Sequence, residues 1–157
     1  MDISSFTSPY RCSLLVKAYK GWFTRQDRVL DLGCGNGLIS LAIKKTYDVD
    51  INCADIKNHL LYDLPFKLIK SGKKLPFADK KFDVVMLNDV LHHIPFGDQF
   101  FLVSESLRIA NKLLIFEARP TLVGKGFDII LNKLHYKSLD TPLSFREIKQ
   151  WILFLNR

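Results

Sequence analysis

A glycine-rich heptapeptide, DLGCGNG at residues 31–37, has the residue types and spacing best suited to holding a ligand. It begins within the apolar run Val29–Leu32 and leads into an amphipathic run, Gly37 to Lys45. Glycines let the backbone approach a ligand closely, and the first N–H groups of a helix point toward polar or anionic groups. The heptapeptide therefore predicts a cofactor cradle; the simpler alternative is an ordinary strand-to-helix turn that needs positive φ.

The spacing of these glycines argues against a dinucleotide cofactor. Gly33 and Gly35 fit the first two positions of the G-x-G-x-x-G fingerprint, but Leu38 stands at the third. An NAD-linked oxidoreductase is therefore disfavoured.

A second candidate ligand group is Asp55, which ends an apolar run and lies 22 positions after Gly33. In nucleotide-binding α/β domains an acidic residue at this place accepts hydrogen bonds from the ribose hydroxyls. Strand-ending aspartates also cap following segments, so Asp55 capping the segment Ile56 to Leu61 is the alternative. Its pairing with the glycine loop favours a nucleoside site.

His92 and His93 are the candidate catalytic side chains, because histidine can act as a general base near neutral pH. Two adjacent histidines on a short helix are expected to point in different directions, so at most one faces a pocket. Structural or capping roles are the stronger interpretation. A metal site is not expected, since no cysteine or acidic partner stands at ligand spacing.

The elements that must position these residues alternate between short apolar runs and longer amphipathic ones, which is typical of parallel-sheet α/β proteins. Ser144 and Glu147 form a capping-box pattern for the last helix. We therefore predict a Rossmann-like, doubly wound, mostly parallel sheet of about five strands with helices on both faces and C-terminal helices. The expected strands are 29–32, 49–54, 66–69, 82–87 and 113–116, and the expected helices are 11–22, 37–45, 98–108, 126–135 and 144–155.

Three sequence blocks, VLDLGCGNG, the acid in CADI and LPFADKKFDVVMLNDVLHHIP, together resemble a class I S-adenosylmethionine-dependent methyltransferase of the small-molecule type. The resemblance covers roughly Arg28 to Ala118. It implies S-adenosylmethionine as the cofactor and methyl transfer as the activity.

The resemblance also implies a set of cofactor-binding residues. The methionine part is expected to be surrounded, largely through backbone groups, by Asp31, Gly33, Cys34 and Gly35, with Asn88 near the methionine amino group and the transferable methyl. Asp55 is expected to hold the ribose and Ile56 to pack on the adenine. Ser71 and Gly72 stand where the family often has an acid-alanine pair near the adenine amino group, which makes adenine recognition there weaker.

The acceptor is expected to be a small or lipid-like molecule. No N-P-P-[YF] sequence follows the fourth strand, where Asn88 to Leu91 stands instead, so the resemblance argues against methylation of the exocyclic amines of bases or of glutamine, and a nucleic-acid acceptor is disfavoured. A methyltransferase-like interaction module with little or no turnover is the alternative function.

The composition is consistent with one globular domain. The chain has 157 residues, 48% of them hydrophobic, and a formal net charge of +7 from dispersed lysines and arginines. We expect an N-terminal helical segment (1–27), a cofactor-binding core (28–118) and a helical C-terminal segment (119–157). No stretch reads as a signal peptide or a transmembrane segment, and the three cysteines form no C-x-x-C pair, so a cytoplasmic location is expected.

The expected fifth strand lies at the edge of the predicted sheet. Members of the resembled family usually finish with a strand hairpin, and no strand-like run follows Phe116. The fifth strand is then an exposed edge unless terminal helices or a second copy cover it. A homodimer through this edge is the expectation.

Overall fold

A computed structural model of the chain describes residues 4–70, 74–117 and 144–155. The helices are α1 (Ser4–Ala18), α2 (Leu38–Tyr47), α3 (Phe96–Ile109) and α5 (Ile148–Leu155), with a short 3₁₀ helix, η1 (Leu91–His93). The strands are β1 (Arg28–Leu32), β2 (Asp50–Asp55), β3 (Phe66–Leu68), β4 (Phe82–Asn88) and β5 (Ala110–Phe116).

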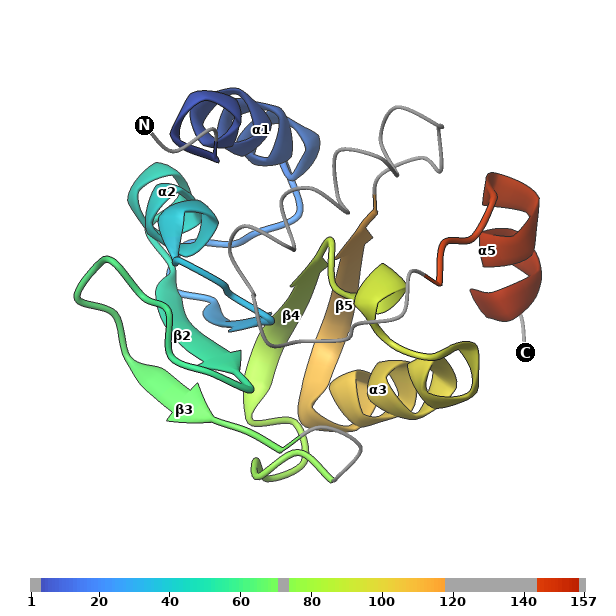
Figure 1. Ribbon diagram of the computed structural model, residues 1–157. Helices are drawn as coiled ribbons and strands as arrows, with labels where there is room; N and C mark the ends of the chain where they lie inside the picture. Colours follow the sequence, from blue (N-terminus) through green and yellow to red (C-terminus); the bar gives the residue numbers. More distant parts are fainter. Residues whose placement is uncertain (1–3, 71–73, 118–143, 156–157) are drawn as a thin grey trace.

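These strands form one parallel sheet in the order β3-β2-β1-β4-β5 (Figure 1). The order reverses direction at β1, which pairs with β2 on one side and β4 on the other. Such a sheet places its ligand crevice at the carboxyl ends of the strands beside the reversal point. The predicted fold class is confirmed, and the sheet directs attention to the carboxyl ends of β1, β2 and β4.

Helices cover both faces of the sheet, as predicted (Figure 1). Successive residues of a strand point to opposite faces, and the core divides accordingly. Val29 of β1 packs in a cluster with Leu15 of α1 and Ile43 of α2, whereas Leu30 packs in a second cluster with Val103 of α3. Both faces of β1 are buried, which explains why its sequence is almost continuously apolar.

The predicted boundaries of the first helix are wrong at both ends. The structure has α1 at Ser4–Ala18, whereas the sequence pattern indicated 11–22. After Ala18 the chain closes with tight turns, in which the backbone N–H of Lys20 bonds to the carbonyl of Lys17. Gly21 then takes φ +84°, a conformation that continues no right-handed helix.

The last helix also begins later than predicted. Ser144 does not start it: its N–H donates to the carbonyl of His92 at 2.7 Å, and its carbonyl accepts from the side chain of Gln99 at 3.1 Å. These long-range bonds hold Ser144 outside the helix. The backbone N–H of Glu147 instead donates to the side chain of Gln150. This is one of the two hydrogen bonds of a capping box, with Glu147 and Gln150 in the places predicted for Ser144 and Glu147.

The fifth strand begins at Ala110, three residues before the predicted start. Asn111 and Lys112 have low strand propensity, but pairing with β4, with Phe82 opposite Ala110, extends the ladder over them. The predicted helix at 126–135 lies outside the described residues.

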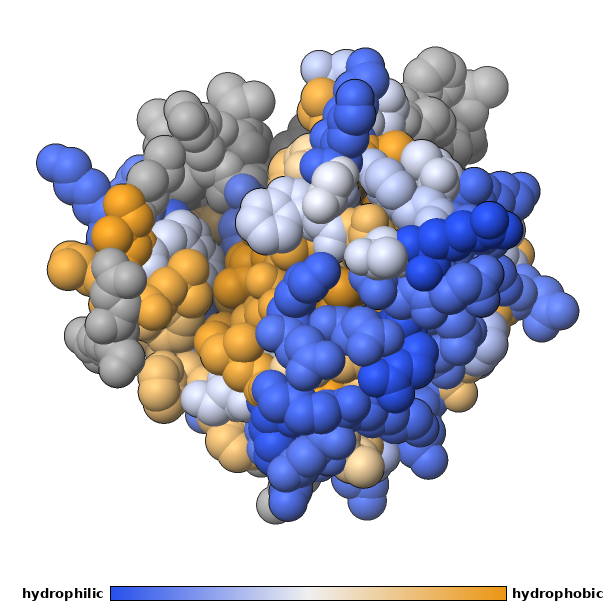
Figure 2. Space-filling view, turned by 180° about the vertical axis from the view of Figure 1, so that it is seen from behind, coloured by the Kyte–Doolittle hydropathy of each residue, from blue (hydrophilic) through white to orange (hydrophobic). Residues whose placement is uncertain are grey.

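Apolar side chains gather on the outer surface of α3 and α5 (Figure 2). Together with β5 they line a groove of about 490 Å³. On α5, Trp151 and Phe154 pack into the core, whereas Ile152 and Leu155 are more than half exposed. Within the described ranges no helix has the length and apolarity that a membrane crossing requires.

Candidate functional site

Four polar side chains meet at the carboxyl edge of the sheet, one from the end of each of four parallel strands. Asp31 lies on β1, Asp55 ends β2, Asn88 ends β4, and Glu117 directly follows β5. The sequence pattern placed Asn88 just past the fourth strand, whereas the structure makes it the last residue of β4. The sheet therefore brings most of the predicted site residues to one edge.

The predicted glycine loop connects β1 to α2 at this edge. Gly33, Gly35 and Gly37 all have positive φ (+84°, +53° and +79°). The N–H of Gly33 donates to the carbonyl of Ala54 at 2.7 Å, which ties the loop to β2. A Cβ on Gly33 would lie 2.5 Å from Cγ2 of Val90, so this glycine is required by packing as well as by conformation.

Cys34 is buried inside the same loop. A hydrogen bond with Cys53 of β2, together with burial, raises the pKa of its thiol. The thiol is therefore protonated at neutral pH, and Cys34 contributes to the loop through packing and backbone rather than as a nucleophile.

Asp55 holds the glycine loop against the end of β2. One carboxylate oxygen accepts the N–H of Gly35 at 3.0 Å, and the other accepts the N–H of Ile56 at 2.7 Å. No helix forms over residues 56–61, but the bond to the N–H of Ile56 means that Asp55 also caps the start of this segment, which was the alternative. Ile56 is 39% exposed beside the carboxylate, which leaves an apolar surface next to a hydrogen-bond acceptor.

Asp31 is the centre of a buried polar network. Its carboxylate accepts the hydroxyl of Ser40 at 2.6 Å and the amide of Asn88 at 3.4 Å, and Asn88 in turn accepts the hydroxyl of Tyr19 at 2.5 Å. Burial raises the pKa of Asp31 to about 6, against the hydrogen bonds from Ser40 and Asn88, which lower it. Sequence reasoning identified Asp31 and Asn88 but missed Ser40 and Tyr19.

Helix α1 is fastened to this edge at two points. Tyr19, just past its end, bonds to Asn88, and Arg11 forms an ion pair with Asp89, the residue after β4. Asp89 has φ +57°, which aspartate tolerates better than most residues. No local signal predicts these contacts, because the paired residues are separated by 69 and 78 positions in sequence.

The two candidate histidines lie on η1, as expected of a short helix. His92 is 2% exposed; its Nδ1 lies 2.6 Å from Oε2 of Glu117, and its ring stacks on Phe145 with centroids 4.7 Å apart. The rings of His92 and His93 are in contact, with centroids 4.0 Å apart, rather than pointing to separate environments. Burial lowers the pKa of His93 to about 4, and its Nδ1 is buried without a hydrogen-bond partner among the described residues.

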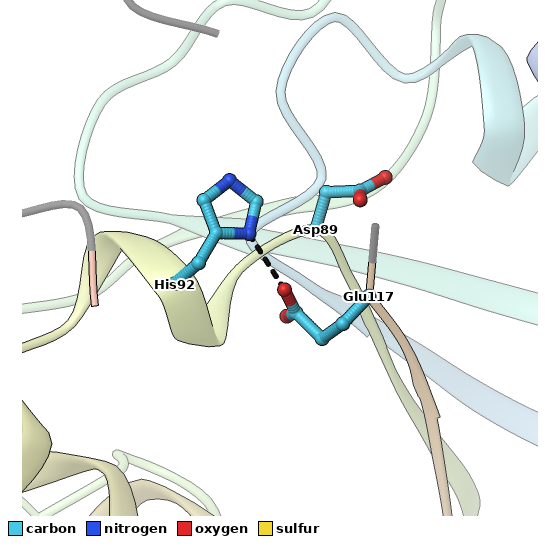
Figure 3. Close-up of side chains that lie close together, drawn as sticks. All are labelled: Asp89, His92 and Glu117. Carbon is cyan, nitrogen blue, oxygen red and sulfur yellow. Dashed lines mark hydrogen bonds and ion pairs between the residues drawn. The ribbon is translucent and has the colours of Figure 1, made fainter. Parts of the chain in front are cut away.

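Glu117 connects η1 to β5. Its Oε1 accepts the N–H groups of Val90 and Leu91 at 3.0 and 2.7 Å, while Oε2 faces His92. Figure 3 shows the Glu117 carboxylate directed at the imidazole, with Asp89 on the adjoining segment. The donor atoms of Asp89, His92 and Glu117 all lie within 4.8 Å of one another.

No metal site was expected from the sequence. The expectation rested on local ligand spacing, and the structure brings two carboxylates to His92 from different segments. Glu117 was not identified from the sequence as a site residue.

The described residues fit the adenosyl cofactor that the sequence resemblance implies. Asp55 offers acceptor oxygens for a ribose, the exposed Ile56 offers a surface for a purine, and the backbone of Gly35 lies beside the Asp55 carboxylate. The two remaining expected cofactor residues, Ser71 and Gly72, lie outside the described residues.

Comparison with known proteins finds similar sequences. A family model described as a methyltransferase domain matches residues 30–112. The chain is 30% identical over 95 residues to the 27-O-demethylrifamycin SV methyltransferase of Amycolatopsis mediterranei, covering 53% of this chain and 34% of that protein. It is 29% identical over 142 residues to the ribosomal protein L11 methyltransferase of Campylobacter concisus, covering 82% of this chain and 46% of that protein. The chain therefore spans between a third and a half of these relatives.

Solved structures share the fold. A SAM-dependent methyltransferase from Archaeoglobus fulgidus superimposes with a TM-score of 0.66 at 19% sequence identity, covering 96% of this chain and 71% of that one.

Replacing Gly33 by alanine is expected to destabilise the protein more than replacing Gly21. Both glycines have φ +84°, so both substitutions incur the strain of a left-handed alanine, about 1 to 2 kcal/mol. Only the Gly33 variant also meets Val90, which adds about 1 to 3 kcal/mol of overpacking. Urea unfolding of both variants measures the difference, and equal losses would contradict the close approach to Val90.

The buried Asp31 is expected to make stability pH-dependent. Its pKa is about 6 in the folded protein against an ordinary value of 3.8, so its contribution is complete below about pH 3.8 and is lost as the pH rises through 6. The unfolding free energy of the wild type minus that of Asp31→Asn should fall by about 2 to 3 kcal/mol from pH 4 to pH 7. Denaturant unfolding at several pH values tests this, and a constant difference contradicts it.

Proposed function

The chain belongs to the methyltransferase domain family, and from this premise we propose that it transfers a methyl group from S-adenosylmethionine to a small-molecule or lipid-like acceptor. The observation that carries the proposal is the contact between Asp55 and the glycine loop, a carboxylate at the end of β2 bonded to the N–H of Gly35. This contact joins the two parts of the sequence expected to hold the ribose and the methionine of one cofactor.

In the proposed arrangement each end of the cofactor has its own residues. Asp55 accepts the ribose hydroxyls and Ile56 packs on the adenine. Asp31, Asn88 and the backbone of residues 33–35 surround the methionine part. The buried carboxylate of Asp31 is complementary to the positive charge of the methionine amino group.

The cofactor supplies an electrophilic methyl group on a sulfonium, which is a good leaving group. The protein can therefore contribute much of the rate by orienting the acceptor and excluding water, and a dedicated base is optional. Of the two catalytic candidates, His92 has a ring fixed by Glu117 and Phe145. We assign to His92 and His93 the shaping of the acceptor side, where η1 follows β4.

The proposed acceptor class is supported by the name of a relative and by exposed apolar side chains. One curated relative is named for an O-demethylrifamycin substrate and the other for a ribosomal protein. Exposed aromatic side chains, among them Tyr10 and Phe96, permit an apolar acceptor. The competing function is an interaction module without turnover, which retains cofactor binding but shows no methyl transfer.

We also propose that the chain self-associates through β5. This strand is an edge of the sheet formed by the described residues, and apolar side chains of α3 and α5 lie beside it on the surface (Figure 2). An unpaired edge next to an apolar surface favours pairing with a second copy.

Replacing Asp55 by alanine is expected to weaken S-adenosylmethionine binding about ten- to a hundredfold, because hydrogen bonds to a charged acceptor contribute about 1.5 to 3 kcal/mol. Calorimetric titration with S-adenosylmethionine, S-adenosylhomocysteine and NAD measures this. Asp55→Asn should lose less, since its amide oxygen can still accept the Gly35 N–H.

Asp50→Ala is the matched control, because Asp50 is an exposed aspartate at the opposite end of the same strand. Unchanged affinity in Asp55→Ala removes the ribose role. Binding of NAD alone overturns the proposed cofactor site, and cofactor binding without methyl transfer to any acceptor favours the interaction module.

The molar mass in solution is expected to be twice that of one chain if the β5 edge pairs. Light scattering coupled to size-exclusion chromatography measures it, with Leu113→Lys on β5 expected to shift the mass toward the monomer. A monomeric wild-type chain contradicts the proposed association.

A further inference from the structure

A second group of polar side chains lies beside the cofactor loop and is not needed to hold the cofactor. Asp89, His92 and Glu117 come from three consecutive places on the edge: the turn after β4, the helix η1 and the residue after β5. Their donor atoms, one imidazole nitrogen and two carboxylate groups, lie within 4.8 Å of one another (Figure 3).

Two of these donors are held in place by their surroundings. The backbone N–H groups of Val90 and Leu91 occupy Oε1 of Glu117, which directs Oε2 toward His92. The ring of His92 is fixed by stacking on Phe145, with only 9° between the ring planes. Such outer contacts, which orient ligand groups in advance, are typical of metal sites.

The two carboxylates of the cluster favour a positive charge beside them. The side chains of Glu117 and Asp89 are only 6% and 16% exposed, and two carboxylates so close together in a poorly solvated place repel each other. In this structure the guanidinium of Arg11, which reaches Asp89 from α1, compensates the charge of Asp89. The Arg11 side chain is 38% exposed, so it can leave the ion pair for solvent.

We propose that Asp89, His92 and Glu117 bind one divalent cation of the Mn²⁺ or Zn²⁺ type, which replaces Arg11 as the counter-charge. Imidazole with carboxylate oxygens suits these ions at about 2.0 to 2.2 Å. Neighbouring donors around one such ion lie about 3 to 3.5 Å apart, so on binding the 4.8 Å cluster has to contract and the 2.6 Å contact between Nδ1 of His92 and Oε2 of Glu117 has to open. Three protein donors leave at least one coordination position for an oxygen of the acceptor.

This role for the ion rests on the proposed function, because it assigns the bound oxygen to the methyl acceptor. Its position next to Asn88 places the ion on the acceptor side of the expected methyl group. The acceptors favoured by such a site carry a hydroxyl or carbonyl oxygen.

Metal binding by the full chain is tested by calorimetric titration with Mn²⁺ and Zn²⁺ after chelator treatment, without S-adenosylmethionine. We expect one ion per chain, at least tenfold weaker binding in Asp89→Asn, and several-fold tighter binding in Arg11→Gln, which lacks the competing charge. Asp63→Asn, a change at an exposed aspartate, is the matched control and should bind as the wild type does.

No saturable binding of either ion up to about 1 mM, equal affinity in Asp89→Asn and the wild type, or weaker binding in Arg11→Gln would each overturn the proposal. A measurement on the wild type alone does not depend on the folding of a variant. Mn²⁺ is expected to broaden the NMR resonances of the His92 ring by paramagnetic relaxation. Broadening of other resonances without those of His92 contradicts the proposed site. Because cofactor binding is titrated separately, failure of the metal site and failure of the proposed function are distinguishable.

Discussion

The structure depends on the parallel pairing of β1 with β2 on one side and β4 on the other. Because β1 is buried on both faces, its apolar residues fix it at the centre of the sheet, and its carboxyl end has to open into a turn between two neighbouring strands. The glycine loop is that turn. Since all strands are parallel, the polar residues at their carboxyl ends lie at the same edge of the sheet.

The polar groups at this edge are buried, and their hydrogen bonds explain how the fold tolerates them. Asp31 is satisfied by Ser40 and Asn88, and Asn88 by Tyr19. A buried polar group without a partner costs about 1 to 3 kcal/mol, so each of these bonds restricts where its element can lie. In this way α1, which packs on one face, is also positioned over the carboxyl end of β4.

The fold class and most elements were predictable, and the errors at α5 and β5 share one cause. Periodicity located β1, β2, β4, α2 and α3 within two residues at each end, because burial of one face or both imposes a local pattern. The errors at α5 and β5 occur where a long-range bond overrides that pattern. Ser144 is held by His92 and Gln99 instead of capping a helix, and Asn111 is in a strand because β4 pairs with it.

What the sequence determined by itself is the local chemistry: a loop of three glycines with positive φ, an acid at the end of the next strand, and hence the expected cofactor. These are features of short segments, where residue type and neighbours decide the conformation, and the resemblance of the sequence blocks to a known family supplied the identity of the cofactor. Only the tertiary structure decided which side chains stand together beyond the loop. Glu117 reaches His92 across 25 positions and Arg11 reaches Asp89 across 78, and no spacing in the sequence encodes such contacts, because they exist only once the sheet has aligned the ends of its strands.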